Sequence, residues 1–321
     1  MWHGFRTEWQ RRMIALARSV RAKEFMQSNR AASFLVRKYV AGETSRDGAR
    51  RAVELLRAQG LRASLYYLGE YVDTPELIHE NVDQKLRAVE ALGGAGIDIH
   101  VSVDPTQIGF QQDHALARRN AEAIARAIAA ASAGKAGLHC MMLDMEDLSV
   151  AESTIALHDE LRAQQLPVAL TLQAYLRRTA ADLGRQIQLG SKVRMVKGAF
   201  AESAEVAYQG DAAVKANFRA LIERMFSSEA RERSFYPILA THDTALHDLA
   251  IGLARKNAWA PGTYEFEMLL GVRPDVSSSL AQRGERVRLY LPFGRDWWPY
   301  AVRRIGENPA NIALLGRSLF T

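Results

Sequence analysis

"YPILATHDTALHDLAIGLARKN", residues 236–257, shows the unit from which we expect this chain to be built. Residues 236–242 form a short apolar and β-branched run, which is typical of a buried strand. Residues 243–257 follow at once and have apolar side chains at helical spacing. A strand that leads directly into a helix is the unit of a parallel α/β fold.

The same unit recurs along most of the chain. From about residue 62 to 307, short strand-like runs alternate with helix-like segments such as 114–132. Eight such runs indicate an α/β protein with a (βα)8 TIM-type barrel, preceded by N-terminal helices. We therefore predict two domains, a helical arm at 1–58 and a catalytic barrel at 59–321. The predicted strands are 61–69, 97–103, 138–144, 166–173, 192–198, 236–242, 263–269 and 286–292.

Composition limits the class of protein. The chain has 321 residues, of which 48% are apolar and 24% charged, with a single cysteine. No apolar run approaches the length of about 18 residues that a membrane span needs, and the start lacks the apolar stretch of a secretory signal. Cys140 lies in an apolar run without a partner, which excludes a disulfide framework and a cysteine metal site. We expect a soluble protein of the cytoplasm.

The charge of the chain does not indicate nucleic acid. The formal net charge is +6, but the arginines are spread along the whole sequence instead of forming one basic stripe. Only the N-terminal segment is both basic and aromatic, with Trp2, Phe5 and Trp9 at near-helical spacing. It suits an arm packed on the protein, which we favour, or a helix at a membrane surface, so peripheral membrane contact stays open.

Polar side chains end nearly every predicted strand. Barrel enzymes build their active sites at these carboxyl ends, so the pattern indicates an enzyme. The residues concerned are Glu70, Asp104, Asp144, Glu146, Gln173, Lys197, Thr241, His242, Glu265 or Glu267, and Tyr290.

A pair of arginines follows the last predicted strand. Tyr300, Arg303, Arg304 and Glu307 fall at i, i+3, i+4 and i+7 and share one helix face. Two guanidinium groups near a barrel mouth suit a carboxylate or a phosphate. The alternative is a solvated Arg303–Glu307 pair, and the spacing alone leaves both open.

Two further motifs stand at strand ends. "LDMED" (143–147) offers three carboxylates for Mg²⁺ or acid–base chemistry, or Asp144 points inward while the others cap the next helix. "VRMVKGAF" (193–200) combines Arg194 and Lys197 with a glycine, which suits a phosphate or a flavin. The chain contains neither a G-x-G-x-x-G nor a Walker motif.

Together these motifs resemble proline dehydrogenases, FAD-dependent (βα)8-barrel enzymes that oxidise L-proline to Δ1-pyrroline-5-carboxylate. The resemblance implies that Arg303 and Arg304 bind the substrate carboxylate, that Glu307 orients them and that Tyr290 and Tyr300 wall the pocket. It rests on the motifs "LGEYV" (68–72), "VSVDPTQIG" (101–109), "LDMED" (143–147), "LTLQAYLRRT" (170–179), "VRMVKGAF" (193–200), "ILATHD" (238–243), "YEFEMLLGV" (264–272) and "YLPFGRDWWPYAVRRIGEN" (290–308).

The resemblance also implies a catalytic centre and a cofactor site. Asp144 is then the acid beside the pocket, and Arg194 lies near the flavin atom that accepts hydride. The FAD contacts implied are Met145, Gln173, Arg194, Lys197, Gly198, Ala199, Thr241 and His242, and no metal is implied.

Four positions depart from the family pattern. Asp104 replaces a lysine that pairs with the substrate carboxylate, and Tyr66 replaces an aspartate; Phe200 and Glu267 replace a tyrosine and a glutamine. Asp104 would repel a carboxylate unless it turns away, pairs with an arginine of the 303–304 pair, or meets a donor on the substrate. The substrate is therefore open between L-proline and a proline-like or N-modified amino acid.

Two other functions are compatible with these motifs. One is a metal-dependent lyase or aldolase on the same barrel, and another is a flavin-binding homologue with an altered substrate. The expected electron acceptor is a quinone or oxygen.

Overall fold

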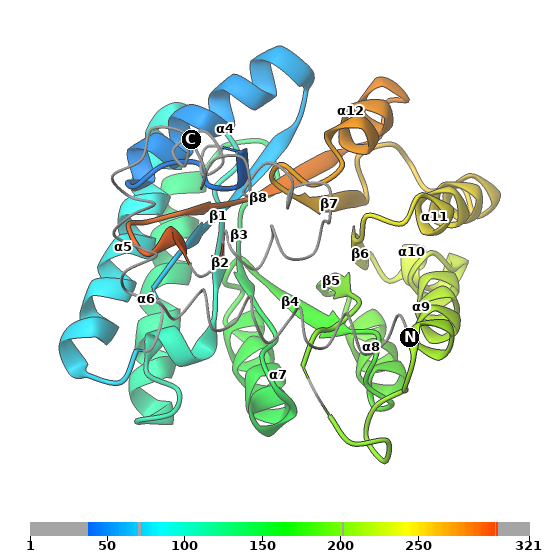
Figure 1. Cartoon of the computed structure of the whole chain (residues 1–321), viewed down its shortest axis with the longest axis horizontal. Coiled ribbons are helices and arrows are strands. Elements are labelled where there is room, and N and C mark those ends of the chain that lie inside the picture. The colour runs from blue at the N-terminus through cyan, green and yellow to red at the C-terminus, as the bar shows by residue number, and fades with distance from the viewer. Residues whose placement is uncertain (1–37, 70–71, 201, 299, 301–321) are drawn as a thin grey trace, which may run out of the picture.

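A closed barrel of eight parallel strands forms the centre of the protein (Figure 1). The computed structural model describes residues 38–69, 72–200, 202–298 and 300. Each strand pairs with the next in chain order, and β1 closes the barrel against β8. The strands are β1 (Arg62–Tyr67), β2 (His100–Val103), β3 (Cys140–Leu143), β4 (Val168–Gln173), β5 (Lys192–Val196), β6 (Tyr236–Ala240), β7 (Glu265–Leu269) and β8 (Val287–Phe293).

Helices surround the barrel and connect its strands (Figure 1). They begin at identifiable caps; for example, Thr44 and Asp47 form a capping box at the start of α4, and the helix ends at Gly60, whose φ is 69°. The helices are α4 (Ser45–Gln59), α5 (Pro75–Ala95), the 3-10 helix η1 (Pro105–Ile108), α6 (His114–Ser132), α7 (Leu148–Ala163), α8 (Thr179–Gln188), α9 (Asp211–Met225), α10 (Ser228–Glu232), α11 (Thr244–Lys256) and α12 (Pro274–Gln282).

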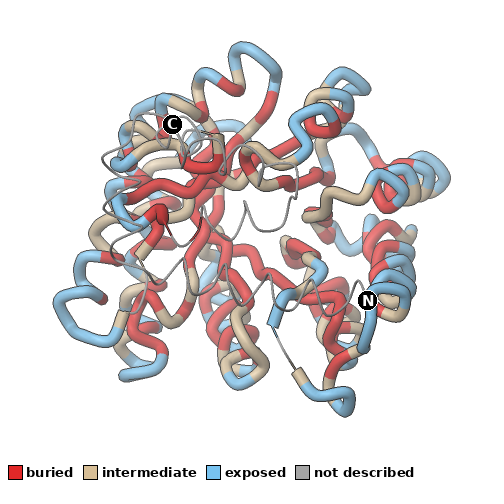
Figure 2. Tube along the Cα trace, in the orientation of Figure 1, coloured by how far each residue is buried: buried red, intermediate tan, exposed pale blue. Residues whose placement is uncertain are grey.

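Alternate residues of each strand face the helices or the barrel interior. On β3, Met141 and Leu143 belong to the large apolar core shared with the helices. Cys140 and Met142 belong to a separate small cluster with Ala169 of β4. Figure 2 shows that the strands are almost entirely buried. Side chains that point inward at the carboxyl end of a strand therefore emerge at the mouth of the barrel.

A charged network fills the opposite end of the barrel. Arg288 of β8 is fully buried and donates from Nε to Glu265 Oε1 at 2.7 Å. Its Nη2 donates to Asp98 Oδ2 at 2.8 Å, and Arg62 reaches the same oxygen at 2.9 Å. These groups compensate one another inside the protein, where an unpaired charge would be costly.

The barrel predicted from the alternation is confirmed, and each of the eight runs overlaps a strand. Most strands are shorter than the runs: β2 begins at His100, three residues after the start of its run, and β5 ends at Val196, two residues before the end of its run. The predicted arm lies mostly outside the described residues. Its described part includes α4, which packs on β1 and α5, so a division at residue 58 stays a prediction.

Candidate active site

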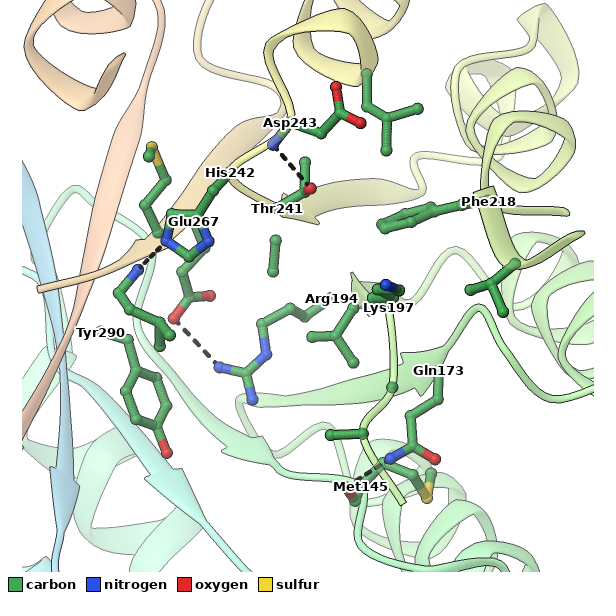
Figure 3. Close-up of a pocket in the computed structure, with 18 of the residues that line it drawn as sticks. Met145, Gln173, Arg194, Lys197, Phe218, Thr241, His242, Asp243, Glu267 and Tyr290 are labelled. Atoms are coloured by element: carbon green, nitrogen blue, oxygen red, sulfur yellow. Dashed lines mark hydrogen bonds and ion pairs between the residues drawn. The ribbon is translucent and has the colours of Figure 1, made fainter. Parts of the chain in front are cut away.

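A large cavity opens at the carboxyl ends of the strands. Its volume is about 790 Å³, and residues from β3 through β8 and from α9 line it. This is the size of a pocket for a cofactor or small ligand. Figure 3 shows its labelled side chains converging from neighbouring strands.

Arg194 of β5 lies at the floor of this cavity. It is 4% exposed, and its guanidinium donates to Thr171 Oγ1 from both Nε and Nη2, at 3.1 and 2.9 Å. Its Nη1 donates to Glu267 Oε1 at 3.2 Å, and its Nη2 forms an ion pair with Asp144. One guanidinium thus holds two carboxylates from opposite sides of the barrel.

The charges around Arg194 perturb one another. Burial disfavours the charge of Arg194, but Asp144 and Glu267 outweigh burial and raise its pKa above the ordinary value. Burial raises the pKa of Glu267, and its Oε2 has no hydrogen-bond partner among the described residues. The floor therefore combines a permanent cation with a carboxyl group that is costly to ionise.

Tyr290 of β8 completes the wall beside Asp144. Its hydroxyl donates to Asp144 Oδ2 at 2.9 Å, and Arg194 lies 5.5 Å from the centre of its ring. Asp144 therefore accepts from both Arg194 and Tyr290, which fixes the direction of its carboxylate.

All eight residues predicted to contact a cofactor line this one cavity. They come from four strand ends, so the fold brings together residues far apart in the sequence. They are Met145, Gln173, Arg194, Lys197, Gly198, Ala199, Thr241 and His242, and the cavity also includes Asp144, Tyr290 and Tyr300.

Gln173 offers the cavity an unused acceptor. Its Nε2 donates to the backbone oxygens of Met145 and Glu146, at 3.1 and 3.2 Å (Figure 3). Its Oε1 is buried and has no partner among the described residues. A buried oxygen of this kind calls for an N–H donor, such as those of a flavin ring.

The segment after β5 passes close to the cavity because it contains Gly198. This residue has φ 94°, and a Cβ at its position would overlap the ring of Tyr175. Only glycine satisfies both conditions, so backbone amides can approach a ligand here. Lys197 adds a positive charge, and its Nζ lies 2.7 Å from Asp211 Oδ1 at the start of α9.

The end of β6 is held by hydrogen bonds to its own loop and to β7. His242 Nε2 accepts from the backbone N–H of Leu269 at 3.1 Å, so a neutral ring carries its proton on Nδ1. Thr241 Oγ1 accepts from the N–H of Asp243 at 3.2 Å. These bonds orient both side chains at the cavity (Figure 3).

Asp104 does not line the cavity but lies one strand away from it. Val103 pairs with Leu143, so Asp104 and Asp144 directly follow two adjacent strands. Tyr66 donates to Asp104 Oδ2 at 2.6 Å, and its ring centre lies 5.2 Å from that of Tyr290. Two of the residues that depart from the family pattern therefore bind each other.

The arginine pair cannot be placed. Arg303, Arg304 and Glu307 lie outside the described residues, as does Glu70. Their expected roles stay predictions.

One buried lysine was not predicted from the sequence. Lys85 of α5 is fully buried, and its Nζ donates to Gln107 Oε1 at 2.8 Å. A signal was present, because Ile78, Lys85, Val89 and Leu92 share the buried stripe of the helix. A lysine in such a stripe needs a polar partner.

Within the described ranges, no group of three or more His, Cys, Asp or Glu side chains is arranged to hold a metal ion. No helix in that part of the chain is long and apolar enough to cross a membrane.

Comparison with known sequences identifies relatives. Residues 49–316 match the family model described as proline dehydrogenase. A proline dehydrogenase of Deinococcus radiodurans is 36% identical over 289 residues, covering 88% of each chain. Proline dehydrogenase 1 of Bacillus subtilis subsp. natto is 32% identical over 279 residues, covering 87% of this chain and 88% of the relative.

Solved structures share the fold. Proline utilization A from Bdellovibrio bacteriovorus, inactivated by N-propargylglycine, superposes with a TM-score of 0.76 at 20% identity and covers 86% of this chain. Proline utilization A from Corynebacterium freiburgense superposes with a TM-score of 0.71 at 21% identity and covers 97% of this chain. The chain spans 33% and 34% of the lengths of those proteins.

Proposed function

Because the chain belongs to the proline dehydrogenase family, we propose that it uses FAD to oxidise the C–N bond of L-proline or of a proline-like or N-modified amino acid. The protein is an oxidoreductase, and its family implies a flavin. The redox function is thus supported over a metal-dependent lyase. A quinone or oxygen is the electron acceptor we propose.

One observation carries the assignment of FAD to this cavity. The eight residues expected to contact a flavin, although scattered over about a hundred positions of the sequence, line a single cavity. The donor set suits the group: Gln173 Oε1 is an acceptor without a partner, and Gly198 admits a close approach of the backbone. When bound, FAD supplies the two-electron acceptor for hydride.

The residues of the chain have distinct tasks in this proposal. Arg194 provides positive charge at the floor, which favours negative charge that develops there. Tyr290 and Arg194 hold the Asp144 carboxylate in one orientation beside the substrate. Arg303 and Arg304 anchor the substrate carboxylate, as their spacing and the resemblance predict, with Glu307 orienting them. Anchoring and orientation supply much of the rate in such reactions.

The test is a flavin analysis followed by an anaerobic screen. Chromatography of the denatured protein should find FAD. L-proline, trans-4-hydroxy-L-proline and N-methyl-L-proline are then mixed with the holoprotein without oxygen, and loss of the visible flavin band is recorded. Bleaching by at least one of them is expected. A protein that neither contains nor binds FAD, or a flavin that none of them reduces, would refute the proposal.

A further inference from the structure

A chain of hydrogen bonds runs from the buried Lys85 to Asp104. Lys85 Nζ donates to Gln107 Oε1 at 2.8 Å, and Gln107 Nε2 donates to the hydroxyl oxygen of Tyr66 at 3.1 Å. The Tyr66 hydroxyl donates to Asp104 Oδ2 at 2.6 Å. We call these three bonds the Lys85–Asp104 chain.

The direction of every bond in this chain is determined by its first member. An ammonium group only donates, so the amide oxygen of Gln107 must face Lys85 and its NH2 group must face Tyr66. The Tyr66 oxygen accepts that N–H, and its own proton points to Asp104. Oδ2 of Asp104 is therefore an acceptor, and a proton taken up by this carboxyl group goes to Oδ1.

Gln107 is itself held in this orientation. Its Nε2 also donates to the backbone oxygen of Gly69 at 2.8 Å, and the side chain is 4% exposed. Lys85 makes a second, longer bond to Asn81 Oδ1 at 3.4 Å, and its Nζ lies 5.8 Å from the ring centre of Tyr67. The Lys85–Asp104 chain is thus part of the packed interface between α5, η1 and β1.

Oδ1 of Asp104 is available to a ligand as a hydrogen-bond acceptor. Asp104 is only partly buried, and Oδ1 forms no hydrogen bond with a described residue. Asp144, its neighbour on β3, lines the cavity, and so does Tyr290, whose ring packs on Tyr66. The end of the chain therefore lies beside the reaction space.

On the basis of the proposed function, we infer that Asp104 accepts the proton of the substrate ammonium on Oδ1, with Tyr66, Gln107 and Lys85 as positioning residues. In this step one N–H bond of the ammonium breaks, its electron pair stays on nitrogen, and an O–H bond forms at Oδ1. The resulting neutral amine is the form from which hydride can leave the adjacent carbon. A cation facing Asp104 also removes the repulsion that a carboxylate would meet there.

The charges that face Asp104 suit this task. Burial, Asp144 and Glu146 raise its pKa, while the Tyr66 hydrogen bond and Lys85 lower it, with a result of about 7. Burial lowers the pKa of Lys85 to about 8. Tyr290 contributes its hydroxyl from β8, and its own pKa is raised by burial. A base whose pKa lies near neutral pH can both take up and release a proton.

The experiment is the pH dependence of anaerobic flavin reduction by stopped flow. The probe is whichever of L-proline, trans-4-hydroxy-L-proline and N-methyl-L-proline reduces the holoenzyme fastest. The wild-type rate should rise with pH and level off above a pKa of about 7. Asp104→Asn should remove this rise, the ascending limb of the pH profile. It should also lower the plateau rate at least tenfold, since general-base catalysis contributes about a hundredfold or more.

Tyr66→Phe and Lys85→Met test the positioning role. Each removes a stabiliser of the ionised carboxylate, so the limb should move to higher pH, by about one unit for Tyr66→Phe, which loses a hydrogen bond to a charged group. Tyr66→Phe keeps the ring on Tyr290 and is the safer variant for folding. Tyr67→Phe is the matched control, because the Tyr67 hydroxyl donates to Glu80, which is not part of the Lys85–Asp104 chain. This variant should leave the ascending limb at the same pH.

The outcomes separate the inference from the function on which it rests. If none of the three probes bleaches the wild-type flavin, the proposed function fails. If bleaching occurs but the rising limb survives in Asp104→Asn, the limb belongs to the substrate amine and the inference is overturned. A rate that falls above neutral pH would instead make protonated Asp104 a donor to the substrate carboxylate, and would overturn it as well.

Discussion

Arg194 Nη1 donates to Glu267 Oε1 at 3.2 Å, while Nη2 of the same guanidinium pairs with Asp144. At the cavity floor, two carboxyl groups therefore share one guanidinium group. Glu267 is 2% exposed, and burial raises its pKa. The positive charge that Arg194 offers to a reduced flavin thus depends on the protonation of Glu267.

Glu267→Gln should raise the midpoint potential of the bound flavin. Glutamine keeps the shape and the bond to Arg194 but removes a negative charge, so reduction becomes more favourable. We expect a rise of roughly 20–60 mV at alkaline pH, since about 30 mV corresponds to about 1.4 kcal/mol for two electrons. The measurement is a reductive titration against a reference dye.

The difference should shrink at acidic pH, where wild-type Glu267 takes up a proton. Asp243→Asn is the control, because this residue lines the same cavity but is partly exposed and pairs with Lys215 at 2.5 Å. Asparagine also preserves the helix cap at this position. An unchanged or lower potential in Glu267→Gln would show that Glu267 does not modulate Arg194.

Gly198→Ala should weaken both folding and flavin retention. Its φ is 94°, and the new methyl group would overlap Tyr175. Strain of this kind costs about 1–3 kcal/mol. Gly210→Ala is the matched control, because φ is 79° but nothing lies within 4 Å of the added atom. The thermal unfolding temperature and the FAD content should fall more for Gly198→Ala than for Gly210→Ala. Equal losses in the two variants would contradict the steric argument.

The sequence predicted the barrel well because periodicity reports local geometry. Each strand and helix has its own alternation of apolar residues, and eight such units close in few ways. Part of the cavity lining followed from the same rule, since residues such as Gln173 and Thr241 stand at strand ends, whereas Met145 and Ala199 were implied only by the family resemblance. No detail of side-chain pairing was needed for this.

The Lys85–Asp104 chain could not be predicted in the same way. It joins α5, η1, β1 and the residue that follows β2, and sequence separation gives no indication that Lys85 lies next to Gln107. Helical periodicity placed residue 85 on a buried face, but the partner of a buried lysine depends on tertiary packing. The pairing of Tyr66 with Asp104 likewise depends on the register of β1 and β2.

Asp98→Asn should destabilise the protein at neutral pH by about 3 kcal/mol, because it breaks a buried ion pair. Arg288 would remain fully buried with one partner fewer. Burial opposes ionisation of Asp98, but Arg288 and Arg62 outweigh it and hold its pKa below the ordinary value. Urea unfolding curves at several pH values measure the effect.

The pH dependence of this stabilisation has a definite sign. A carboxyl group with a lowered pKa stabilises the fold fully above its unfolded pKa, 3.8, and the contribution is lost as pH falls through the folded pKa. The gap between wild type and Asp98→Asn should therefore be widest at neutral pH and close under acid. Asp248→Asn removes an exposed partner of Arg283 and should change stability by less than about 0.5 kcal/mol. A gap that widens under acid would contradict the assignment.

Arg303→Ala and Arg304→Ala should weaken the binding of a carboxylate without loss of FAD. Their spacing with Tyr300 places them on one face of the helix predicted after β8, and the family resemblance assigns them to the substrate carboxylate. Cyclopentanecarboxylate, which has a ring and a carboxylate but no amine, is the probe, and its binding is read from the flavin spectrum. Loss of one charge-assisted hydrogen bond costs about 1.5–3 kcal/mol, so the Kd should rise roughly ten- to a hundredfold.

Pyrrolidine, which has the amine without the carboxylate, should bind each variant as it binds the wild type. Arg295→Ala is the control for a nearby exposed arginine, whose side chain is 86% exposed, and it should change neither Kd. If both probes weaken together, the arginines support the pocket as a whole; if neither weakens, Arg303 and Glu307 form a solvated pair and the carboxylate is bound elsewhere.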